Sequence, residues 1–352
     1  MDLSVSTETL VRHSVKPNKK SMTSKLSNTL LTCPQHKNVV ARSGEFLVCS
    51  GGCKFPVIRY MEQEIIDFGG NIDRNSTQKN LLFYNGQEQN ERYRSFLLWL
   101  FSTFNTDEES FRKMLLSRLA IPQGGKVLVT GCGNGDDLAA LAKHYPSKNL
   151  DIHAQDISPE MVWETAKTVT QIGMQQVTLS VSDATNLPYQ DGMFDAVFHF
   201  GGINFMPDVR NAISEMARVC KNAGGVGFGD ESIAPWLRDS EYYRMLVENN
   251  SLWSTTSPLH LLPPCATKVN ATWILENCFY FIDFVKDLQF PSINIDIPHI
   301  GVRGGSIRTR YYGKLEGVTE EARNIAKAEA QRQGISISTW LDTIIKQSRH
   351  PN

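Results

Sequence analysis

The sequence predicts an α/β fold in which a mostly parallel sheet is covered by helices on both faces. Three observations support this prediction: short apolar runs alternate with stretches of helical periodicity, a glycine-rich turn joins one run to a helix, and an acidic residue ends the next run. The runs that we expect to form parallel strands are residues 127–130, 150–156, 177–181, 194–200 and 224–230.

A glycine-rich turn follows the first of these strands. Gly131, Gly133 and Gly135 separate the apolar residues 127–130 from a segment that favours a helix. Glycine permits positive φ and has no side chain to keep a ligand away from the backbone. Because similar turns without a ligand occur in many α/β proteins, this turn indicates a nucleotide-like ligand only together with acidic partners.

Two acidic residues occupy the places that such a ligand requires. Asp156 ends the second strand, where a carboxylate can accept both hydroxyls of a ribose. Asp183 follows the third strand and could hold an adenine amino group. Either residue could instead cap the next segment or shape a turn. The order of these residues along one chain favours ligand binding.

With these residues the chain resembles the class I, Rossmann-like, S-adenosylmethionine-dependent methyltransferases, especially the type-11 group that includes ubiquinone and menaquinone biosynthesis enzymes. The resemblance covers residues 124–231. It also rests on Asp183-Ala184, Leu187-Pro188, Phe194-Asp195 and the run from Glu215 to Gly225. It implies a seven-stranded sheet with helices on both faces. The antiparallel end of that sheet is expected at residues 278–285, as the sixth strand, and 307–314, as the seventh.

The resemblance implies S-adenosyl-L-methionine as the cofactor. The implied binding residues are Gly131, Cys132, Gly133, Gly135, Asp156, Ile157, Asp183, Ala184 and Phe200. This family usually has an acidic residue two positions before the first glycine, where it helps to hold the cofactor's ammonium group. Here that position is Val129. Another group must take this role, or the affinity for the cofactor is lower.

In this family, the segment after the fourth strand lies beside the transferred methyl group. His199 is therefore the candidate base for a hydroxyl or acidic-carbon acceptor, although its position also suits a partly buried strand histidine. Asn204, Tyr243 and His260 are the candidate substrate residues. The aromatic insert at about residues 232–306 suits either a pocket for a flat acceptor or a lid packed on the sheet.

Apolar residues between positions 91 and 119 have spacings that favour one or two amphipathic helices. We expect these helices to pack on the core. Helices in this place commonly cover the active site of the family, so Tyr93 and Phe101 could also face the substrate.

The odd number of cysteines, seven, argues against a disulfide framework. Cys33 and His36 share one short turn, Cys49 and Cys53 share another, and a strand-like stretch at residues 39–48 separates them. This spacing is typical of a zinc ribbon in which a tetrahedral Zn²⁺ has a structural role; a loop with free thiols is the alternative. The segment resembles zinc-ribbon modules beside some methyltransferase domains, including those of certain ribosomal RNA guanine methyltransferases.

The predicted organisation has four parts. They are a disordered tail at 1–28, a zinc-ribbon-like module at 29–66, a methyltransferase domain at 85–316, and a C-terminal helical extension at 317–352. In the extension, a capping-box-like start at Thr319 and a stop at Gly334 bound one helix, and a second runs from Ser338 through Ile345. This helical hairpin could dock on its own domain or on a second copy, forming a homodimer. It is loosely similar to ribbon-helix-helix DNA-binding modules, which the charge of the chain does not favour.

Composition limits the partners of the protein. A formal charge of -1 argues against a strongly basic surface, so nucleic acid is not the expected partner. No apolar run approaches the length needed to cross a bilayer, and the first residues lack the apolar core of a secretory signal. We therefore expect a cytoplasmic protein, although residues 1–28 slightly resemble a transit peptide.

The sequence thus predicts methyl transfer from S-adenosyl-L-methionine to a small-molecule acceptor, aromatic or from secondary metabolism, by in-line displacement. Two alternatives remain open. An RNA methyltransferase acting on rRNA or tRNA could grip its substrate with the zinc lobe, near Lys37, Arg42, Lys54 and Arg59. A protein that binds the cofactor but acts as a non-catalytic scaffold would also fit the motif.

Overall fold

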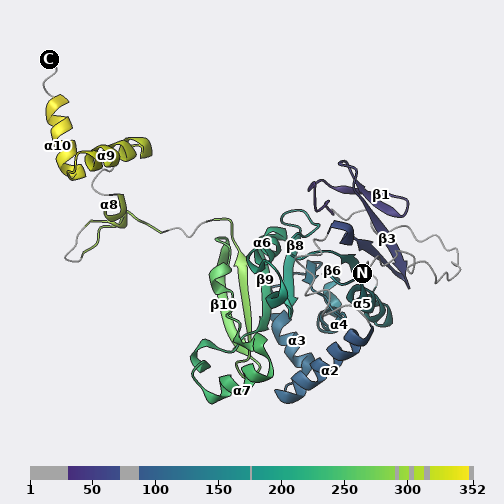
Figure 1. The fold of residues 1–352 in the computed structure, drawn as a ribbon. Coiled ribbons are helices and arrows are strands. Elements are labelled where there is room, and N and C mark those ends of the chain that lie inside the picture. The colour runs from purple at the N-terminus through teal and green to yellow at the C-terminus, as the bar shows by residue number, and fades with distance from the viewer. Residues whose placement is uncertain are drawn as a thin grey trace, which may run out of the picture. The chain divides into compact units, whose positions relative to one another are not determined.

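The computed structural model of the chain describes residues 31–71, 87–174, 177–289, 293–300, 305–312 and 318–348 (Figure 1). The chain forms two compact units, Met1–Leu288 and Gln289–Asn352. The predicted disordered tail at 1–28 lies outside the described residues. Among the helices that are described, none is long and apolar enough to cross a membrane.

Five parallel strands form the centre of the sheet in the first unit, in the spatial order β7, β6, β5, β8, β9. Their bounds are Lys126–Thr130 (β5), Asp151–Asp156 (β6), Val177–Val181 (β7), Phe194–Phe200 (β8) and Cys220–Glu231 (β9). The strand order reverses at β5, because successive strands are added first on one side of it and then on the other. In open α/β sheets, ligands bind at the carboxyl ends of the strands beside such a reversal.

Helices cover both faces of this sheet, as the sequence predicts, and each face has its own core. The first core contains apolar residues of α2 (Gln87–Thr103), α3 (Glu108–Ser117), α4 (Asp136–His144) and α5 (Pro159–Gln171). The second contains residues of α6 (Val209–Val219) and of the N-terminal strands. Neighbouring β5 residues alternate between the two cores: Val127 and Val129 face the first, and Leu128 faces the second.

The antiparallel end of the sheet differs from the prediction. The sixth and seventh strands are β10 (Ala266–Ile274) and β11 (Phe279–Lys286), and β11 lies between β9 and β10, antiparallel to both. The expected seventh strand at 307–314 is wrong, because Ile307–Tyr312 is the helix α8. Almost every residue of β11 is buried, so it occupies an interior position, whereas the polar β10 suits the exposed edge.

The N-terminal lobe extends the sheet to eleven strands, four more than expected. Its antiparallel strands are β1 (Val40–Ser43), β2 (Phe46–Cys49), β3 (Lys54–Tyr60) and β4 (Gln63–Asp67). β4 pairs in parallel with β7, with Ile65 opposite Leu179. Both Ile65 and Ile66 are fully buried. The lobe therefore shares the hydrophobic core of the main domain. Its strand β4 also covers the edge that β7 would otherwise leave open.

The second unit contains the two helices predicted near the end of the chain, α9 (Glu320–Arg332) and α10 (Ile337–Ser348). The Thr319 hydroxyl caps α9 by accepting a hydrogen bond from the Ala322 backbone N. Gly334 follows α9 with a φ of 65°, which suits the end of a helix. α9 and α10 contact each other, so this segment is a helical hairpin.

Candidate active site

The turn after β5 has a backbone that requires its glycines. Gly131, Gly133 and Gly135 have φ values of 61°, 50° and 86°, which lie in the left-handed region. A Cβ on Gly131 would lie 3.0 Å from the His199 ring, and a Cβ on Gly135 would lie 3.2 Å from the Thr165 backbone. Larger residues would therefore disturb the turn, whose Gly131 and Gly133 line a cavity.

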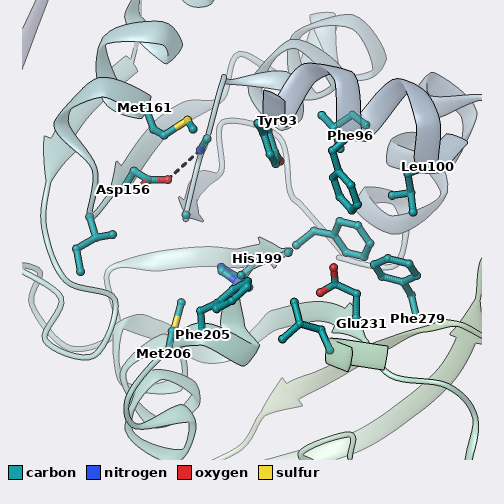
Figure 2. Close-up of a pocket in the computed structure, with 18 of the residues that line it drawn as sticks. Tyr93, Phe96, Leu100, Asp156, Met161, His199, Phe205, Met206, Glu231 and Phe279 are labelled. Carbon is teal, nitrogen blue, oxygen red and sulfur yellow. Dashed lines mark hydrogen bonds between the residues drawn. The ribbon is translucent and has the colours of Figure 1, made fainter. Parts of the chain in front are cut away.

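The Asp156 carboxylate at the end of β6 holds this turn in place. Its Oδ2 accepts a hydrogen bond from the Gly133 backbone N at 3.0 Å (Figure 2). Its Oδ1 accepts one from the Ser158 backbone N at 3.0 Å. Burial raises the pKa of Asp156, while these N–H groups act in the opposite direction. Asp156 is thus an acceptor fixed in the wall of the cavity.

Asp183 and Ala184, which follow β7, line the same cavity. The Asp183 Oδ1 accepts hydrogen bonds from the Thr185 backbone N and hydroxyl, both at 2.8 Å. These bonds orient the carboxylate and form a turn. Asp183 therefore shapes the turn, as the structural alternative proposed, and also forms part of the cavity wall.

The cavity has a volume of about 640 Å³ and lies at the carboxyl ends of the central strands (Figure 2). One half, which we call the glycine-loop half, is lined by Gly131, Gly133, Asp156, Ile157, Asp183 and Ala184. The other half, which we call the aromatic half, is lined by Phe96, Trp99, Leu100, Phe200, Phe205, Phe279 and Glu231. A polar backbone cradle therefore opens directly into an apolar chamber.

Helix α2 contributes part of the cavity wall. Tyr93 lines the cavity, and its ring lies 3.7 Å from the place that a Cβ on Gly133 would occupy. Phe101 also lines the cavity, while its ring packs against Phe111 at a centroid distance of 5.4 Å. Both Tyr93 and Phe101 thus face the cavity, and Phe101 serves the core as well.

A buried ion-pair cluster supports the turn from α3. The Arg112 guanidinium donates hydrogen bonds to Asp137 at 2.6 Å and to Glu108 at 2.7 Å, and it lies 3.6 Å from Asp136. Arg112 and Asp137 are only 7% and 5% exposed, and Arg112 also lines the cavity. Val129 is fully buried within the first core. Arg112 of α3 therefore brings a charged cluster, shared with the start of α4, to this end of the cavity.

His199, near the end of β8, has one nitrogen paired and one unpaired. Its Nδ1 lies 2.9 Å from the Thr130 carbonyl oxygen, which can only accept a hydrogen bond, so we assign the proton to Nδ1. The buried Nε2 has no partner among the described residues. Burial lowers the pKa of His199, which favours a neutral ring with an unshared electron pair on Nε2.

Glu231 is a cavity residue to which the sequence analysis assigned no role. It is the last residue of β9, is 8% exposed and lies opposite Phe279 of β11. Burial, together with the nearby Asp230 carboxylate, raises the pKa of Glu231 well above its ordinary value. A sequence signal was available, because Glu231 follows an apolar strand on the ligand-binding edge of the sheet.

The remaining predicted site residues do not line the cavity within the described part of the chain. Cys132 is buried beneath the turn and accepts a hydrogen bond from the Thr165 hydroxyl. Asn204 uses its side chain to donate to the Glu231 carbonyl oxygen at 2.8 Å. Tyr243 packs against the first core, and His260 is exposed on a short 3-10 helix.

The structure brings the four candidate metal ligands together. The ligand atoms of Cys33, His36, Cys49 and Cys53 lie within 4.8 Å of one another. The three Sγ to Nδ1 distances are 3.6, 3.4 and 3.5 Å. Zn–S bonds of about 2.3 Å and Zn–N bonds of about 2.0 Å would place sulfur and nitrogen about 3.5 Å apart around a tetrahedral ion. A Cβ on Gly51 would lie 2.4 Å from the His36 ring, so this glycine allows the close approach.

Comparison with known proteins agrees with the central part of this arrangement. Residues 127–224 match a family model described as a methyltransferase domain. A demethylmenaquinone methyltransferase of Anoxybacillus flavithermus is 32% identical over 117 residues, which are 33% of this chain and 49% of that protein. The aklanonic acid methyltransferase DauC of a Streptomyces species is 31% identical over 105 residues, 30% of this chain and 47% of that protein.

A longer but weaker match is the ubiquinone/menaquinone biosynthesis C-methyltransferase UbiE of Citrifermentans bemidjiense. It is 24% identical over 212 residues, which cover 58% of this chain and 85% of that protein. The chain spans about half the length of the first curated relatives that it matches. The matched segment contains β5 to β8, the glycine turn and Asp156. Residues 127–224 of this chain are therefore similar to a methyltransferase domain.

Proposed function

We propose that this protein transfers a methyl group from S-adenosyl-L-methionine to a small, partly apolar acceptor. The observation that carries the proposal is the division of one cavity into a glycine-loop half and an aromatic half. A volume of about 640 Å³ lies in the usual range for sites of small ligands and cofactors. The methyl donor and its acceptor would occupy adjoining parts of this space.

The glycine-loop half fits the donor. Gly131 and Gly133 would lie under its methionine part, the Asp156 carboxylate would accept the ribose hydroxyls, and Asp183 would lie beside the adenine. Arg112 is a cationic side chain in the wall of the cavity, so it would meet the donor's carboxylate. Val129 offers no negative charge to the donor's ammonium group. The carboxylate partners of Arg112, which are Glu108, Asp136 and Asp137, would supply that charge instead.

The aromatic half fits a small acceptor better than a nucleic acid. Phe200 and Phe279 stack with their ring centroids 6.1 Å apart, forming a hydrophobic wall. Two of the four basic residues near the metal cluster are already paired: Arg42 and Arg59 both contact Glu64. This neutralisation leaves less positive charge for a phosphate backbone.

Positioning would account for much of the rate enhancement. The donor supplies an electrophilic methyl group on a sulfonium, and the rings of the aromatic half would hold the acceptor in line with it and exclude water. His199 would stay neutral, and its Nε2 could accept a hydrogen bond that an O–H or N–H group of the methyl acceptor donates.

Calorimetry and turnover would test this function. We expect one S-adenosyl-L-methionine to bind per chain, and labelled methyl groups to appear on phenolic or quinol acceptors from a panel that also includes unmodified tRNA and rRNA. Methylation of RNA alone would support the RNA methyltransferase instead. Binding without turnover of any acceptor would favour the non-catalytic scaffold. Absence of S-adenosyl-L-methionine binding would contradict both the methyltransferase and the scaffold.

We also propose that Cys33, His36, Cys49 and Cys53 bind a structural Zn²⁺. Four protein ligands leave no open position for a reacting molecule, and the ion would join the two turns of a lobe that is fastened to the main sheet by β4. Elemental analysis of protein from a zinc-supplemented culture should find about one zinc per chain. Cys49→Ser should lose the zinc, while Cys265→Ser, outside the cluster, should keep it. Wild-type protein without zinc would contradict the proposal.

A further inference from the structure

The position of Glu231 places a carboxyl group inside the aromatic half of the cavity. Glu231 ends β9, which pairs in parallel with β8, the strand that carries His199. Figure 2 shows the Glu231 carboxyl group among the rings, near Phe279. A carboxyl group in this place would meet the acceptor, whereas Asp156, in the opposite half, would meet the ribose.

The surroundings of Glu231 disfavour its charge. Asp230, which is fully buried, accepts hydrogen bonds from the backbone N atoms of Asn204 at 2.7 Å and Glu231 at 2.9 Å. The carboxyl groups of Asp230 and Glu231 therefore lie together. Burial and the neighbouring Asp230 carboxylate both raise the pKa of Glu231, which faces the cavity. Burial is the largest cause of this shift, and Asp230 is the charged neighbour that adds to it. Glu231 therefore retains its proton to a higher pH than an exposed glutamate.

The other titratable or charged groups around this part of the cavity respond differently to an added positive charge. They are Asp230 on the same strand, Tyr280 on β11, His199 on β8, Asp156 on β6, Asp183 after β7, Arg92 and Tyr93 on α2, and Arg112 on α3. Burial lowers the pKa of His199, so it is already neutral, and burial raises the pKa of Tyr280 above its ordinary value near 10. Glu231 and Asp156 remain as the carboxyl groups whose raised pKa a nearby cation would lower.

We infer that Glu231 is the proton acceptor of methyl transfer and that the positive sulfonium of the methyl donor controls its protonation. Binding of the donor would release the Glu231 proton to solvent, leaving a carboxylate near the sulfonium. During transfer, the acceptor's O–H, N–H or acidic C–H proton would move to this carboxylate as the new bond to the methyl carbon forms. The old S–C bond breaks with its electron pair staying on sulfur. Sulfur and Glu231 both end neutral, so the charges balance.

This inference rests on the proposed function, and proton release tests it without a known acceptor. We would titrate the full chain with S-adenosyl-L-methionine and with S-adenosyl-L-homocysteine, which lacks the sulfonium charge but shares the ribose. Calorimetry in phosphate and Tris buffers, whose ionisation heats differ, measures the protons released. We expect the methionine ligand to release up to about one proton more than the homocysteine ligand, with the maximum at a pH above the ordinary glutamate pKa of about 4.3. The contribution of Asp156 through its ribose contact should cancel in this difference.

Two variants locate the proton. Glu231→Gln keeps the shape of the side chain and should remove the difference in proton release between the two ligands, whereas Glu248→Gln, at an exposed position on α7 (Glu241–Asn249), should keep it. Asp230→Asn should move the pH of maximal release downward, because Glu231 loses a neighbouring negative charge. Equal release for both ligands in wild-type protein, or unchanged release in Glu231→Gln, would overturn the inference while the proposed function stands. Failure of the donor to bind would overturn both.

Discussion

The two halves of the cavity differ in how the chain builds them. The glycine-loop half begins in one turn and the end of the next strand, within residues 131–156. The aromatic half combines side chains from α2, β8, β9 and β11 and from the short 3-10 helix Ile203–Phe205. The first half depends mainly on backbone conformation that local sequence specifies, and the second on packing between distant elements. Substitutions should therefore affect donor binding in one half and acceptor chemistry in the other.

The largest expected effect concerns the support of the glycine-loop half. Arg112→Met should lower the free energy of unfolding by about 3 to 5 kcal/mol, because it leaves the buried Asp137 carboxylate without its partner. Urea denaturation would measure the change. Arg94→Met is the matched control, since Arg94 is exposed and lies 4.0 Å from Glu164; it should change stability by less than about 1 kcal/mol. Similar stabilities for the two variants would mean that the cluster contributes little.

Removing the carboxylate of the glycine-loop half should weaken donor binding. Asp156→Ala loses hydrogen bonds to the ribose and to the Gly133 backbone N, so the Kd for S-adenosyl-L-methionine should rise about 10- to 100-fold by calorimetry. Asp191→Ala, at an exposed position outside the cavity, is the control. An unchanged Kd in Asp156→Ala would show that the donor lies elsewhere.

The pH dependence of stability should reveal the buried carboxyl group of the aromatic half. The pKa of Glu231 is raised in the folded state, so its contribution to stability is complete below the unfolded-state pKa of about 4.3 and is lost as pH rises through the folded-state value. Relative to Glu231→Gln, the wild-type protein should lose on the order of 1 kcal/mol for each pH unit in this window. Urea unfolding from pH 5 to 8 would measure it. Parallel pH curves for the two proteins would contradict the assignment.

A smaller effect should separate the two halves directly. Phe205→Leu removes a ring from the aromatic half, so the KM for an acceptor found in the panel should rise about 2- to 10-fold. The Kd for S-adenosyl-L-methionine should stay within about 2-fold. Steady-state kinetics and calorimetry on the same preparation would check both values. A larger change in donor affinity than in acceptor KM would show that Phe205 belongs with the donor.

The sequence predicted those features that depend on local backbone conformation. The turn with Gly131 and Gly133 is present, with Asp156 bonded to it as the following strand ends. The proximity of Cys33, His36, Cys49 and Cys53 was also predictable, because each turn presents its own pair of these residues. The edge strand β10 was missed because its exposed polar residues lack the apolar pattern of a buried strand. β4 was missed because pairing with β7, distant in sequence, determines its place.

By itself, the sequence determined the parallel strands, the glycine turn and the two acidic residues beside it, since glycine content and short apolar runs act over a few residues. Only the tertiary structure decided that the N-terminal lobe continues the sheet and that Asn204 supports the end of β9. It also decided that Glu231 faces a ring-lined cavity. The physical reason is that burial, and the pKa shift that follows from it, arises from residues that packing brings together across long stretches of chain.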